Sequence, residues 1–418
     1  MLLAMVLLCY SLPAQANDTI RVMTYNLLNY RLTSNYCDNG NNHWNTKDSN
    51  MAIIIDYVKP HLLLCQEMSG SDTNGHWKLL QVLRQTDTIT WKKIAWQSNG
   101  SSMTGGIYYR SDKLAFCAKG MIEDGLDGDN LTRGIEWVHL AHRDTMHAHG
   151  ADTVYLRAFN AHFKAGSYTS DEQQRDRAAK ALMAFCYQNP GGAHRIIGGD
   201  FNVKRSQEPC YQTMTQPANV ALRFNDPISM TGTWNNAYAH RHYHTQSTRT
   251  SADDNSGCFS TGGMDDRLDQ ILLSDGMVNG ISRIQYISGS YHTVGNDGQH
   301  FDKHLKDGAN TSVPPAVLDA LYDMSDHLPV VLDLSIIRGW TGLSEDLPQA
   351  QIRTFDSHHD IILGEAWEGG QYQWINVTGQ VLAEGVIDHG VLQLNRLEGV
   401  GVLRLEHPAH EPFTLKLN

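Results

Sequence analysis

Polar side chains that could bind a metal ion or move a proton stand at the ends of six apolar, strand-like runs. The runs are RVMTYNLLNY, LLLCQEM, LRAFNAHFKAG, RIIGGDFNV, RLDQILLS and SDHLPVVLDL. Cleavage of a phosphoester needs groups that absorb charge on the phosphoryl oxygens, activate water and assist the leaving oxygen. The polar residues are of the types that meet these needs: Asn26, Glu67, His162, Asp200, Asn202, Asp269, Asp326 and His327. The set predicts one divalent-metal phosphoesterase site, assembled from segments far apart in the chain.

Three of these residues are predicted to hold the metal. The carboxylates of Glu67 and Asp326 are hard oxygen donors, and the amide oxygen of Asn26 can complete the shell. Donors of this kind suit Mg²⁺ or Mn²⁺, with Ca²⁺ as an alternative, whereas softer metals would lack their usual thiolate ligands.

The activation of water is predicted to depend on two pairs of residues. Asp200 and Asn202 stand one residue apart, so at a strand end their side chains share a face and can orient the attacking water. His327 is the predicted general base because imidazole titrates near neutral pH. Asp269 is the predicted carboxylate on the far side of that imidazole ring.

His162 is predicted to donate a hydrogen bond to a phosphoryl oxygen or to assist the leaving group, and Lys164 on the same strand face would add positive charge. Each residue alone has a structural alternative. Asn26 could be a turn residue, Glu67 a surface carboxylate and His162 a satisfied buried histidine. Their joint occurrence at the ends of apolar runs favours the functional interpretation.

The elements that carry these residues follow from hydrophobic periodicity. Helices are expected over 49–58, 77–85 and 171–187, and the last has two acids in its first turn, where the helix dipole favours negative charge. Strand-like runs between such helices predict an α+β sandwich in which two mixed or mostly antiparallel sheets face each other with helices outside. A doubly wound parallel sheet is disfavoured because there are too few crossover helices.

The ends of the chain differ from the middle in composition. Residues 1–16 combine a short apolar core with Ala14-Gln15-Ala16 and are predicted to be a signal peptide. A membrane anchor is the alternative, but the run is shorter than the ~20 residues that span a bilayer. We expect a catalytic domain over 17–339, a linker over 340–350 and a small all-β domain over 351–418, where short strands alternate with glycine turns. No stable membrane insertion is expected.

Charge and cysteine content constrain the function only weakly. A formal net charge of −12 argues against binding of nucleic acid by bulk electrostatics, although a basic rim or a bound cation can still attract phosphate. Six cysteines remain beyond the predicted signal peptide, and their fifteen full pairings stay open. Cys65, inside an apolar run, is expected to be a buried free thiol.

Two histidine-rich stretches are candidates for further sites. His139, His142, His147 and His149 surround an Arg-Asp turn and are expected to form a solvated hairpin tip rather than a metal site. The stretch 236–249 contains Arg241 with tyrosines and further histidines. It could grip a polyanion by charge and stacking, or it could be an ordinary polar surface loop.

The ordered motifs TYNLLNY, LCQE, NAHFKAG, GGDFN, RLDQIL and SDHLPV resemble the endonuclease/exonuclease/phosphatase superfamily, whose members are deoxyribonuclease-I-like. The resemblance covers roughly residues 20–337. It implies a four-layer α/β sandwich. For the site it implies that Asn26, Glu67 and Asp326 serve the metal. Two further implications are that Asp200 and Asn202 position nucleophile and phosphate, and that the pair of Asp269 and His327 acts with His162.

The chain departs from the family pattern before the run GGIYYRSD. Related proteins carry a carboxylate or tyrosine there, which supports the first histidine or the phosphate, whereas this chain has Ser102, Met103 and Thr104. Arg133, in LTRGIEW, resembles a site-lining arginine of bacterial members and is expected to contact phosphate.

The C-terminal segments INVTGQVLAEG, LNRLEGVGVLRLE and LKLN resemble the sorting domain of the type IX secretion route. This implies the type IX machinery as a partner and a secreted or cell-surface location. A departure is that no aromatic follows Gly401-Val402. An accessory β-sandwich that binds a ligand or stabilises the enzyme is the alternative.

The sequence thus predicts a secreted, divalent-metal-dependent phosphodiesterase, with a nuclease acting on extracellular DNA or RNA as the leading hypothesis. One alternative is a phosphatase or a phospholipid head-group phosphodiesterase, which would use the same site chemistry. The other is a non-catalytic surface binding protein. Oligomeric state and endo or exo cleavage stay open.

Overall fold

The computed structural model describes residues 17–70, 74–86, 90–94, 102–146, 153–189, 194–251 and 257–337. Towards the C-terminus it describes 351–354, 358–362, 369–376, 379–387, 391–395, 401–407 and 410–417. The predicted signal peptide and linker lie outside the described residues, and so do His147 and His149.

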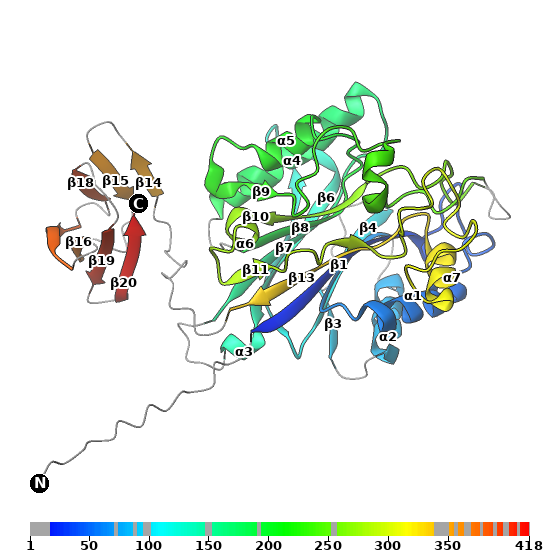
Figure 1. Cartoon of the computed structure of the whole chain (residues 1–418), viewed down its shortest axis with the longest axis horizontal. Helices are drawn as coiled ribbons and strands as arrows, with labels where there is room; N and C mark the ends of the chain where they lie inside the picture. Colours follow the sequence, from blue (N-terminus) through cyan, green and yellow to red (C-terminus); the bar gives the residue numbers. More distant parts are fainter. Residues whose placement is uncertain are drawn as a thin grey trace, which may run out of the picture.

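Two β-sheets face each other in the first 337 residues (Figure 1). The seven-stranded sheet has the order β11-β13-β1-β2-β4-β3, with β12 also paired to β13. Its strands are β1 (Asp18–Tyr30), β2 (Leu62–Ser69), β3 (Trp91–Lys93), β4 (Met103–Arg110), β11 (Ile284–Tyr286), β12 (His292–Thr293) and β13 (Val330–Ile336). Both parallel and antiparallel pairs occur, because β1 runs parallel to β2 and antiparallel to β13.

The six-stranded sheet has the order β5-β6-β7-β8-β10-β9 and is also mixed. Its strands are β5 (Leu114–Asp124), β6 (Asn130–His142), β7 (Tyr155–His162), β8 (Arg195–Asp200), β9 (Phe224–Asn225) and β10 (Asp269–Ser274). Each of the six runs that carry the polar residues contains or leads into one of the strands of these two sheets.

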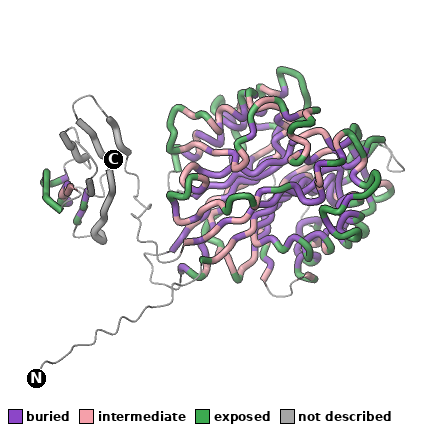
Figure 2. Tube along the Cα trace, in the orientation of Figure 1, coloured by how far each residue is buried: buried purple, intermediate pink, exposed green. Residues whose placement is uncertain are grey.

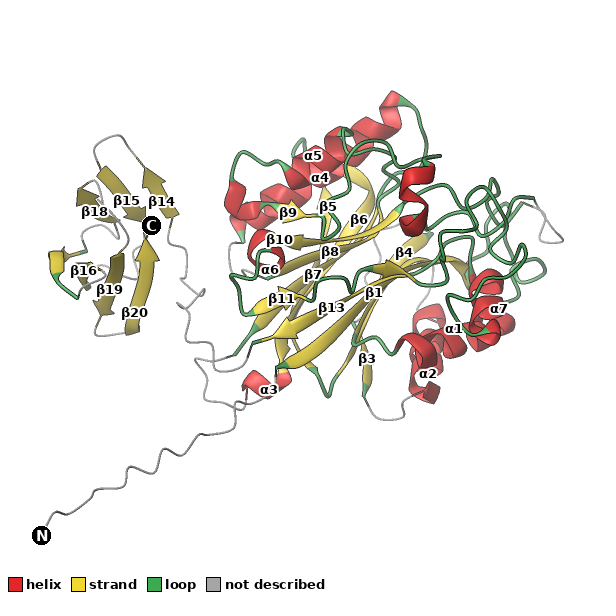
Figure 3. Ribbon diagram, viewed as in Figure 1, coloured by secondary structure: helices red, strands yellow, loops and turns green. Residues whose placement is uncertain are grey.

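Helices cover the outer face of both sheets (Figure 3). The helices α1 (Trp44–Val58), α2 (Asn74–Thr86) and α7 (Pro315–Met324) pack on the seven-stranded sheet, and α4 (Thr169–Gln188) and α5 (Pro209–Thr215) pack on the six-stranded sheet. Shorter helices are α3 (Arg143–Met146), α6 (Asp275–Val278), η2 (Val220–Leu222) and η3 (Tyr238–Tyr243). The predicted α+β sandwich is confirmed, and the three predicted helices correspond to α1, α2 and α4.

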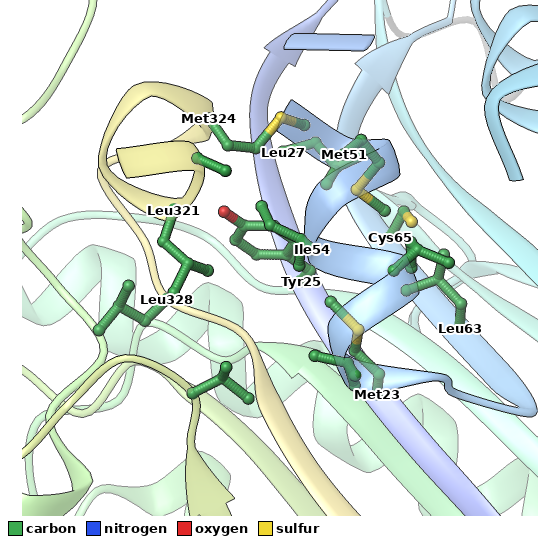
Figure 4. Packing of buried hydrophobic residues seen from close by; sticks show 14 of the residues in the cluster. Met23, Tyr25, Leu27, Met51, Ile54, Leu63, Cys65, Leu321, Met324 and Leu328 are labelled. Carbon is green, nitrogen blue, oxygen red and sulfur yellow. The ribbon is translucent and has the colours of Figure 1, made fainter. Parts of the chain in front are cut away.

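Strand alternation divides the core into three layers, and the burial of the strands is visible in Figure 2. On β1, Val22 points to the layer between the sheets, whereas Met23 and Tyr25 point to the helices. Figure 4 shows these two side chains with Ile54 of α1 and Leu321 of α7 in the outer layer. The faces of each strand are therefore fixed by burial of apolar side chains.

The first histidine-rich stretch differs from its prediction. His142 ends β6 and is buried, with its Nε2 atom 2.8 Å from Asp18 Oδ2, and it is therefore not part of a solvated tip. Asp18 lies with His142 and Asp144 in a group that could hold a cation, but Lys113 already pairs with the Asp18 carboxylate. This ion pair accounts for the charge of Asp18.

The described segments beyond residue 350 are strands and turns. β14 (Gln351–Thr354), β15 (His358–Ile362) and β18 (Val391–Asn395) form one sheet. A second sheet is formed by β16 (Gln371–Asn376), β17 (Val381–Val386), β19 (Gly401–His407) and β20 (His410–Leu417). The exact domain boundaries stay a prediction. Within the described residues, no helix has the length and apolar character needed to cross a bilayer.

Candidate active site

One row of polar side chains crosses the six-stranded sheet. β7 and β8 are parallel and pair His162 with Asp200, and the antiparallel β10 pairs Asp269 with Asp200. Apolar residues an even number of positions away, Ala158 on β7 and Ile271 on β10 among them, lie in the layer between the sheets. Because side chains alternate along a strand, the three polar residues point to the same layer, at its rim.

The two glycines before Asp200 allow this close packing. A Cβ atom on Gly198 would lie 2.8 Å from Leu64 Cδ1 of the opposite sheet. A Cβ atom on Gly199, which has φ +154°, would lie 1.7 Å from the carbonyl oxygen of Ala161 on β7. Glycine at position 199 is therefore required for the approach of β8 to β7, and a larger residue at position 198 would have to displace the Leu64 side chain.

The seven-stranded sheet contributes Asn26 and Glu67 through irregular backbone. The pairing of β1 with β2 shifts register after Asn26, and the pairing of β2 with β4 shifts between Cys65 and Met68. Glu67 itself has φ +57°. Regular alternation after Gln66 would turn Glu67 towards the helices, so the bulge redirects its carboxylate to the rim between the sheets. Such a conformation costs on the order of 1 kcal/mol and is typical of functional sites.

Asn26 links the two sheets at the rim. Its Nδ2 atom donates to Glu67 Oε1 and to Asp200 Oδ2, both at 3.1 Å. Its Oδ1 atom accepts a hydrogen bond from the Leu28 backbone N–H at 3.0 Å. In this arrangement Leu28 uses the amide oxygen and the carboxylates accept hydrogen bonds from the N–H groups, and the role of the oxygen as a metal ligand stays a prediction. Asn26 is a donor that holds the two carboxylates in place.

His327 and Asp269 form a buried pair. His327 Nδ1 lies 2.7 Å from Asp269 Oδ2, and both residues are almost fully buried. Burial by itself lowers the pKa of His327, but the charge and hydrogen bond of Asp269, with Asp326 and Asp200 nearby, raise it well above its usual value. The other ring nitrogen, Nε2, lies 4.0 Å from Asp200 Oδ2 and is the atom that faces the carboxylate group.

Asp200, in the middle of the row, is a strongly perturbed carboxyl. Burial raises its pKa to about 7, and the charges of Asp269 and Glu67 add to this effect, while His327 and the Asn26 hydrogen bond oppose it. Buried carboxylates that face one another without a cation repel, so the site favours either protonation or a bound cation. This is the electrostatic condition expected of a cation site.

Glu67, His162 and Asp200 each offer a ligand atom within 4.8 Å of the others. His162 Nε2 lies 3.4 Å from Asp200 Oδ2 and 3.8 Å from Glu67 Oε1. Burial lowers the pKa of His162 well below its usual value, and Arg133 and His327 lower it further. The two carboxylates fit a Mg²⁺ or Mn²⁺ ion, whereas a thiolate-preferring metal has no ligand here among the described residues.

Asp326 is held by a loop that sequence reasoning did not identify. Its Oδ2 atom accepts hydrogen bonds from the Ser260 backbone N–H at 2.8 Å and from Gln246 Nε2 at 3.2 Å. The Gln246 amide also lies 2.7 Å from His327 Nε2. No periodic pattern marks Gln246 in the sequence, because it lies in an irregular segment whose position depends on the folded loops around it.

Asn202 and Arg133 converge on one backbone carbonyl next to the row. Asn202 Nδ2 donates to the Phe163 oxygen at 3.2 Å, and Arg133 donates to the same oxygen at 2.8 Å. Asn202 has φ +52°, and its backbone N–H donates to Asp200 Oδ1 at 3.0 Å. Burial lowers the pKa of Arg133, while Glu67 and Asp200 oppose this. Asn202 and Arg133 therefore lie beside the carboxylates, and both place hydrogen-bond donors at the rim of the layer between the sheets.

Two predicted substrate contacts lie further out. Lys164 Nζ pairs with Asp171 Oδ1 at 3.0 Å, so its charge is engaged at the start of α4. Arg241 lies in η3, with its guanidinium 4.2 Å from the centre of the Tyr238 ring, which is 60% exposed. Within the stretch 236–249, the first half lies at the surface, whereas His244 and Arg249 in the second half are buried.

Arg249 is a packing residue and not part of a polyanion grip. Its guanidinium lies between the rings of Phe259, at 3.7 Å, and Tyr322, at 3.9 Å, and donates to the Tyr322 carbonyl oxygen. Lys47, which is fully buried, donates to the carbonyls of Leu28 and Met324. Burial lowers the pKa of Lys47 to about 7, although Asp326 and Glu67 oppose this. Arg249 and Lys47 thus hold the loops behind the site through hydrogen bonds to backbone carbonyls.

One disulfide joins these loops, between Cys37 and Cys258, which are 221 residues apart in sequence. The buried Leu28 and Phe259 pack with it. Cys65 is a buried free thiol, in agreement with its prediction.

The described structure has neighbours among solved structures, although no family model and no curated protein matches the chain. One neighbour is an endonuclease/exonuclease/phosphatase family protein from Bacteroides thetaiotaomicron, with 16% identity over 77% of this chain and 99% of that chain, at a TM-score of 0.48. A mannosyl-6-phosphatase from the same organism has 16% identity over 75% of this chain and 99% of its own, at a TM-score of 0.46. The human Nocturnin catalytic domain has 17% identity over 77% and 97%, at a TM-score of 0.45.

Proposed function

We propose that this protein is a divalent-metal-dependent phosphoric ester hydrolase, and within that class a phosphodiesterase that cleaves nucleic acid. The observation that supports it most directly is the buried Asp269–His327 pair, 2.7 Å apart, beside the carboxylates of Glu67 and Asp200. An imidazole oriented by a carboxylate and placed next to a cation-binding group is the arrangement that hydrolytic attack by water requires.

Glu67 and Asp200 would hold the metal. Asp326 is linked to the same site by Gln246, whose amide contacts both Asp326 and His327. When bound, the ion would absorb negative charge on the phosphoryl oxygens and lower the pKa of water. The oxygen donors are already fixed by hydrogen bonds, since Asn26 holds Glu67 and Asp200 and the Ser260 N–H holds Asp326.

The chain's own residues carry the proton movements. His327 Nε2 accepts the proton of the attacking water, and the Asp269 carboxylate stabilises the resulting imidazolium through Nδ1. His162 Nε2, on the neighbouring strand, donates to the departing oxygen or to a non-bridging phosphoryl oxygen. Arg133 and Asn202 contribute hydrogen-bond donors at the rim, where negative charge increases in the transition state.

A nucleic acid substrate is supported by the exposed Tyr238 and the half-buried Arg241 beside it. Arg241 lies five residues before Gln246, and Asn296 fixes the backbone between them by donating to the Arg241 and His244 carbonyls at 2.8 Å. An exposed aromatic ring with a guanidinium against its face can stack on a base and attract a phosphate.

The test is an activity panel with the purified protein. Plasmid DNA, single-stranded DNA and RNA are incubated with Mg²⁺, Mn²⁺ or Ca²⁺, next to phosphomonoesters and phosphocholine lipids. We expect cleavage of at least one nucleic acid that depends on the added cation. Release of phosphate or phosphocholine without nucleic acid cleavage would instead favour the phosphatase or head-group alternative. Turnover of no ester with any cation would favour a non-catalytic binding protein.

We further propose that the protein is exported and sorted by the type IX route. The Cys37–Cys258 disulfide supports an oxidising compartment, and the C-terminal motifs support the route. Expression in a type IX-competent host and in a matched secretion mutant would test this. We expect the protein in the medium or at the surface of the competent host and inside the mutant cells.

A further inference from the structure

One buried ring nitrogen at the site lacks a partner. The His162 side chain is 9% exposed, and its Nδ1 atom has no hydrogen-bond partner among the residues that the structure describes. Its other nitrogen, Nε2, faces Asp200 and Glu67. A buried polar atom without a hydrogen bond costs on the order of 1–3 kcal/mol. A partner for Nδ1 would offset that cost and would also fix which way the ring faces.

A small polar pocket lies beside this ring. His162 lines it together with Thr104, Arg133, Glu136 and Asn160. Glu136 and Asn160 are direct partners in the pairing of β6 with β7, and His162 follows Asn160 by two residues on the same strand face. Diagonal neighbours of this kind have Cα atoms about 7–8 Å apart, which leaves room for one water molecule between an imidazole and a carboxyl group.

Glu136 is a carboxyl group that none of the steps above uses. It accepts hydrogen bonds from Asn160 Nδ2 at 3.0 Å and from Thr104 Oγ1 at 3.4 Å. Each carboxylate oxygen has a second lone pair, so both can accept a further donor. Burial raises the pKa of Glu136 to about 7, and the two hydrogen bonds and Lys119 oppose this. A perturbed carboxyl in a polar pocket beside the reacting groups is a candidate for a functional role.

We propose that Glu136 is a positioning residue for His162, and that it acts through one bound water in this pocket. The Nδ1 proton of His162 is donated to the water, and the water donates to the Glu136 carboxylate. Nδ1 thereby keeps its proton, and Nε2 is the nitrogen that transfers a proton at the phosphoester. The inference rests on the proposed function, in which His162 assists the leaving group.

The alternative role of Glu136 is structural. Asn160 also donates to the Cys65 carbonyl at 2.8 Å and accepts from Gln66 Nε2 at 2.6 Å, so Glu136 belongs to a polar bridge between the sheets. Loss of such a bridge would affect all substrates alike. Loss of the proton donor slows the departure of a poor leaving group far more than that of a good one. A nitrophenolate is a good leaving group because it departs without a proton.

The experiment compares Glu136→Gln with the wild-type protein on two phosphoesters of the class that the activity panel identifies. One has an alkoxide leaving group and the other a p-nitrophenolate leaving group. We expect kcat to fall about 10- to 100-fold on the alkoxide ester and less than about threefold on the nitrophenyl ester, with KM little changed. Equal losses on both esters, or no loss on either, would overturn the proposal. Glu123→Gln, an exposed carboxyl on β5, is the matched control and is expected to match wild type on both esters.

A second measurement does not depend on turnover or on the Glu136→Gln variant. Nitrogen-15 NMR of the wild-type histidine rings with Mg²⁺ reports the protonated nitrogen of each ring, with the His162 signal assigned by its loss in His162→Gln. We expect Nδ1 of His162 to be protonated in the neutral ring and also in the imidazolium form that transfers its Nε2 proton. A ring protonated on Nε2 alone would contradict the positioning role, even if the protein cleaves none of the esters in the panel.

Discussion

At the scale of single residues, the site depends on which atom of each side chain faces its neighbours. His327 presents Nδ1 to Asp269 and Nε2 to the carboxylate group, because the buried Asp269 oxygen lies 2.7 Å from Nδ1. Asn26 presents its N–H groups to Glu67 and Asp200 because its oxygen is already bonded to Leu28. The residue types determine which reactions are possible, and these contacts determine which atom of each side chain faces the reacting groups.

His327→Ala is expected to lower kcat by about 10²–10⁴-fold, because the water loses its proton acceptor. Asp269→Asn is expected to have a smaller effect of the same sign, since the ring stays in place but its charged form is no longer stabilised. His292→Ala, at an exposed histidine on β12, is the control and should retain full activity. Steady-state kinetics decide the outcome, and wild-type rates in His327→Ala would show that the base is misassigned.

Gln246 is the residue that sequence reasoning missed, and its amide contacts both Asp326 and His327. Gln246→Ala is expected to lower kcat/KM roughly tenfold, because the ring and the carboxylate each lose a hydrogen bond of about 1–2 kcal/mol. The exposed Gln299→Ala serves as control. An unchanged kcat/KM in Gln246→Ala would show that the loop contact does not restrain His327.

At the scale of elements, one ion pair ties α4 to the loops that follow β7 and β8. Arg175 donates to Glu208 and to the backbone oxygens of Lys164 and Gly166, and Glu208 accepts from the Lys204 N–H. Both charged side chains are 1% exposed. The strands that carry His162 and Asp200 thus end in loops that the same buried pair holds.

Arg175→Ala is expected to reduce the free energy of unfolding by about 3–5 kcal/mol, because it leaves the Glu208 charge buried without a partner. Arg205→Ala, which breaks a more exposed pair with Glu172, is the control and should cost less than about 1 kcal/mol. Urea denaturation measures both. A similar loss in the two variants would contradict the assigned role of the buried pair.

At the scale of the whole molecule, the two sheets bring carboxylates from both halves of the sandwich into one buried group. A divalent cation relieves their repulsion, so Mg²⁺ or Mn²⁺ is expected to raise the melting temperature and EDTA to remove activity. At a free concentration of 100 times Kd the expected stabilisation is about 2.7 kcal/mol. Differential scanning calorimetry with and without the ion tests this, and an unchanged melting temperature at saturating ion would contradict it.

The affinity for the cation is expected to depend on pH with a defined sign. The pKa of Asp200 is raised to about 7 in the metal-free protein, so below that pH the carboxyl holds a proton that binding must displace. Affinity should therefore fall by up to about tenfold per pH unit below 7 and level off above it. Calorimetric titration with Mn²⁺ at pH 6, 7 and 8 measures the trend. Asp200→Asn should abolish the trend, and a persistent one would place the proton elsewhere.

The Cys37–Cys258 disulfide connects two loops that are 221 residues apart in sequence. Cys37→Ser is expected to reduce the free energy of unfolding by about 2–5 kcal/mol, because the unfolded chain regains the freedom of a long loop. Cys117→Ser, at an exposed free thiol, is the control and should change stability by less than about 0.5 kcal/mol. Thermal melts of both variants without reductant provide the comparison.

Hydrophobic alternation in the sequence determined much of the architecture. The six apolar runs lead into strands or form them, and the three predicted helices are present, because burial of alternate side chains is a local property of a strand or helix. The same alternation places His162, Asp200 and Asp269 on one face. The face that each of these residues occupies could therefore be predicted from its own segment, whereas their meeting in one row depends on the register between the strands.

Only the tertiary structure decided the contacts that arise between distant or irregular segments. The bulge that turns Glu67, the loop that brings Gln246 to His327 and the pairing of Cys37 with Cys258 leave no periodic signal. The buried states of His142 and Arg249 were also missed, because polar residues in a histidine-rich stretch look solvated until their partners are known. Local periodicity fixes which face a side chain occupies. The partner on that face is fixed by packing across the whole sandwich.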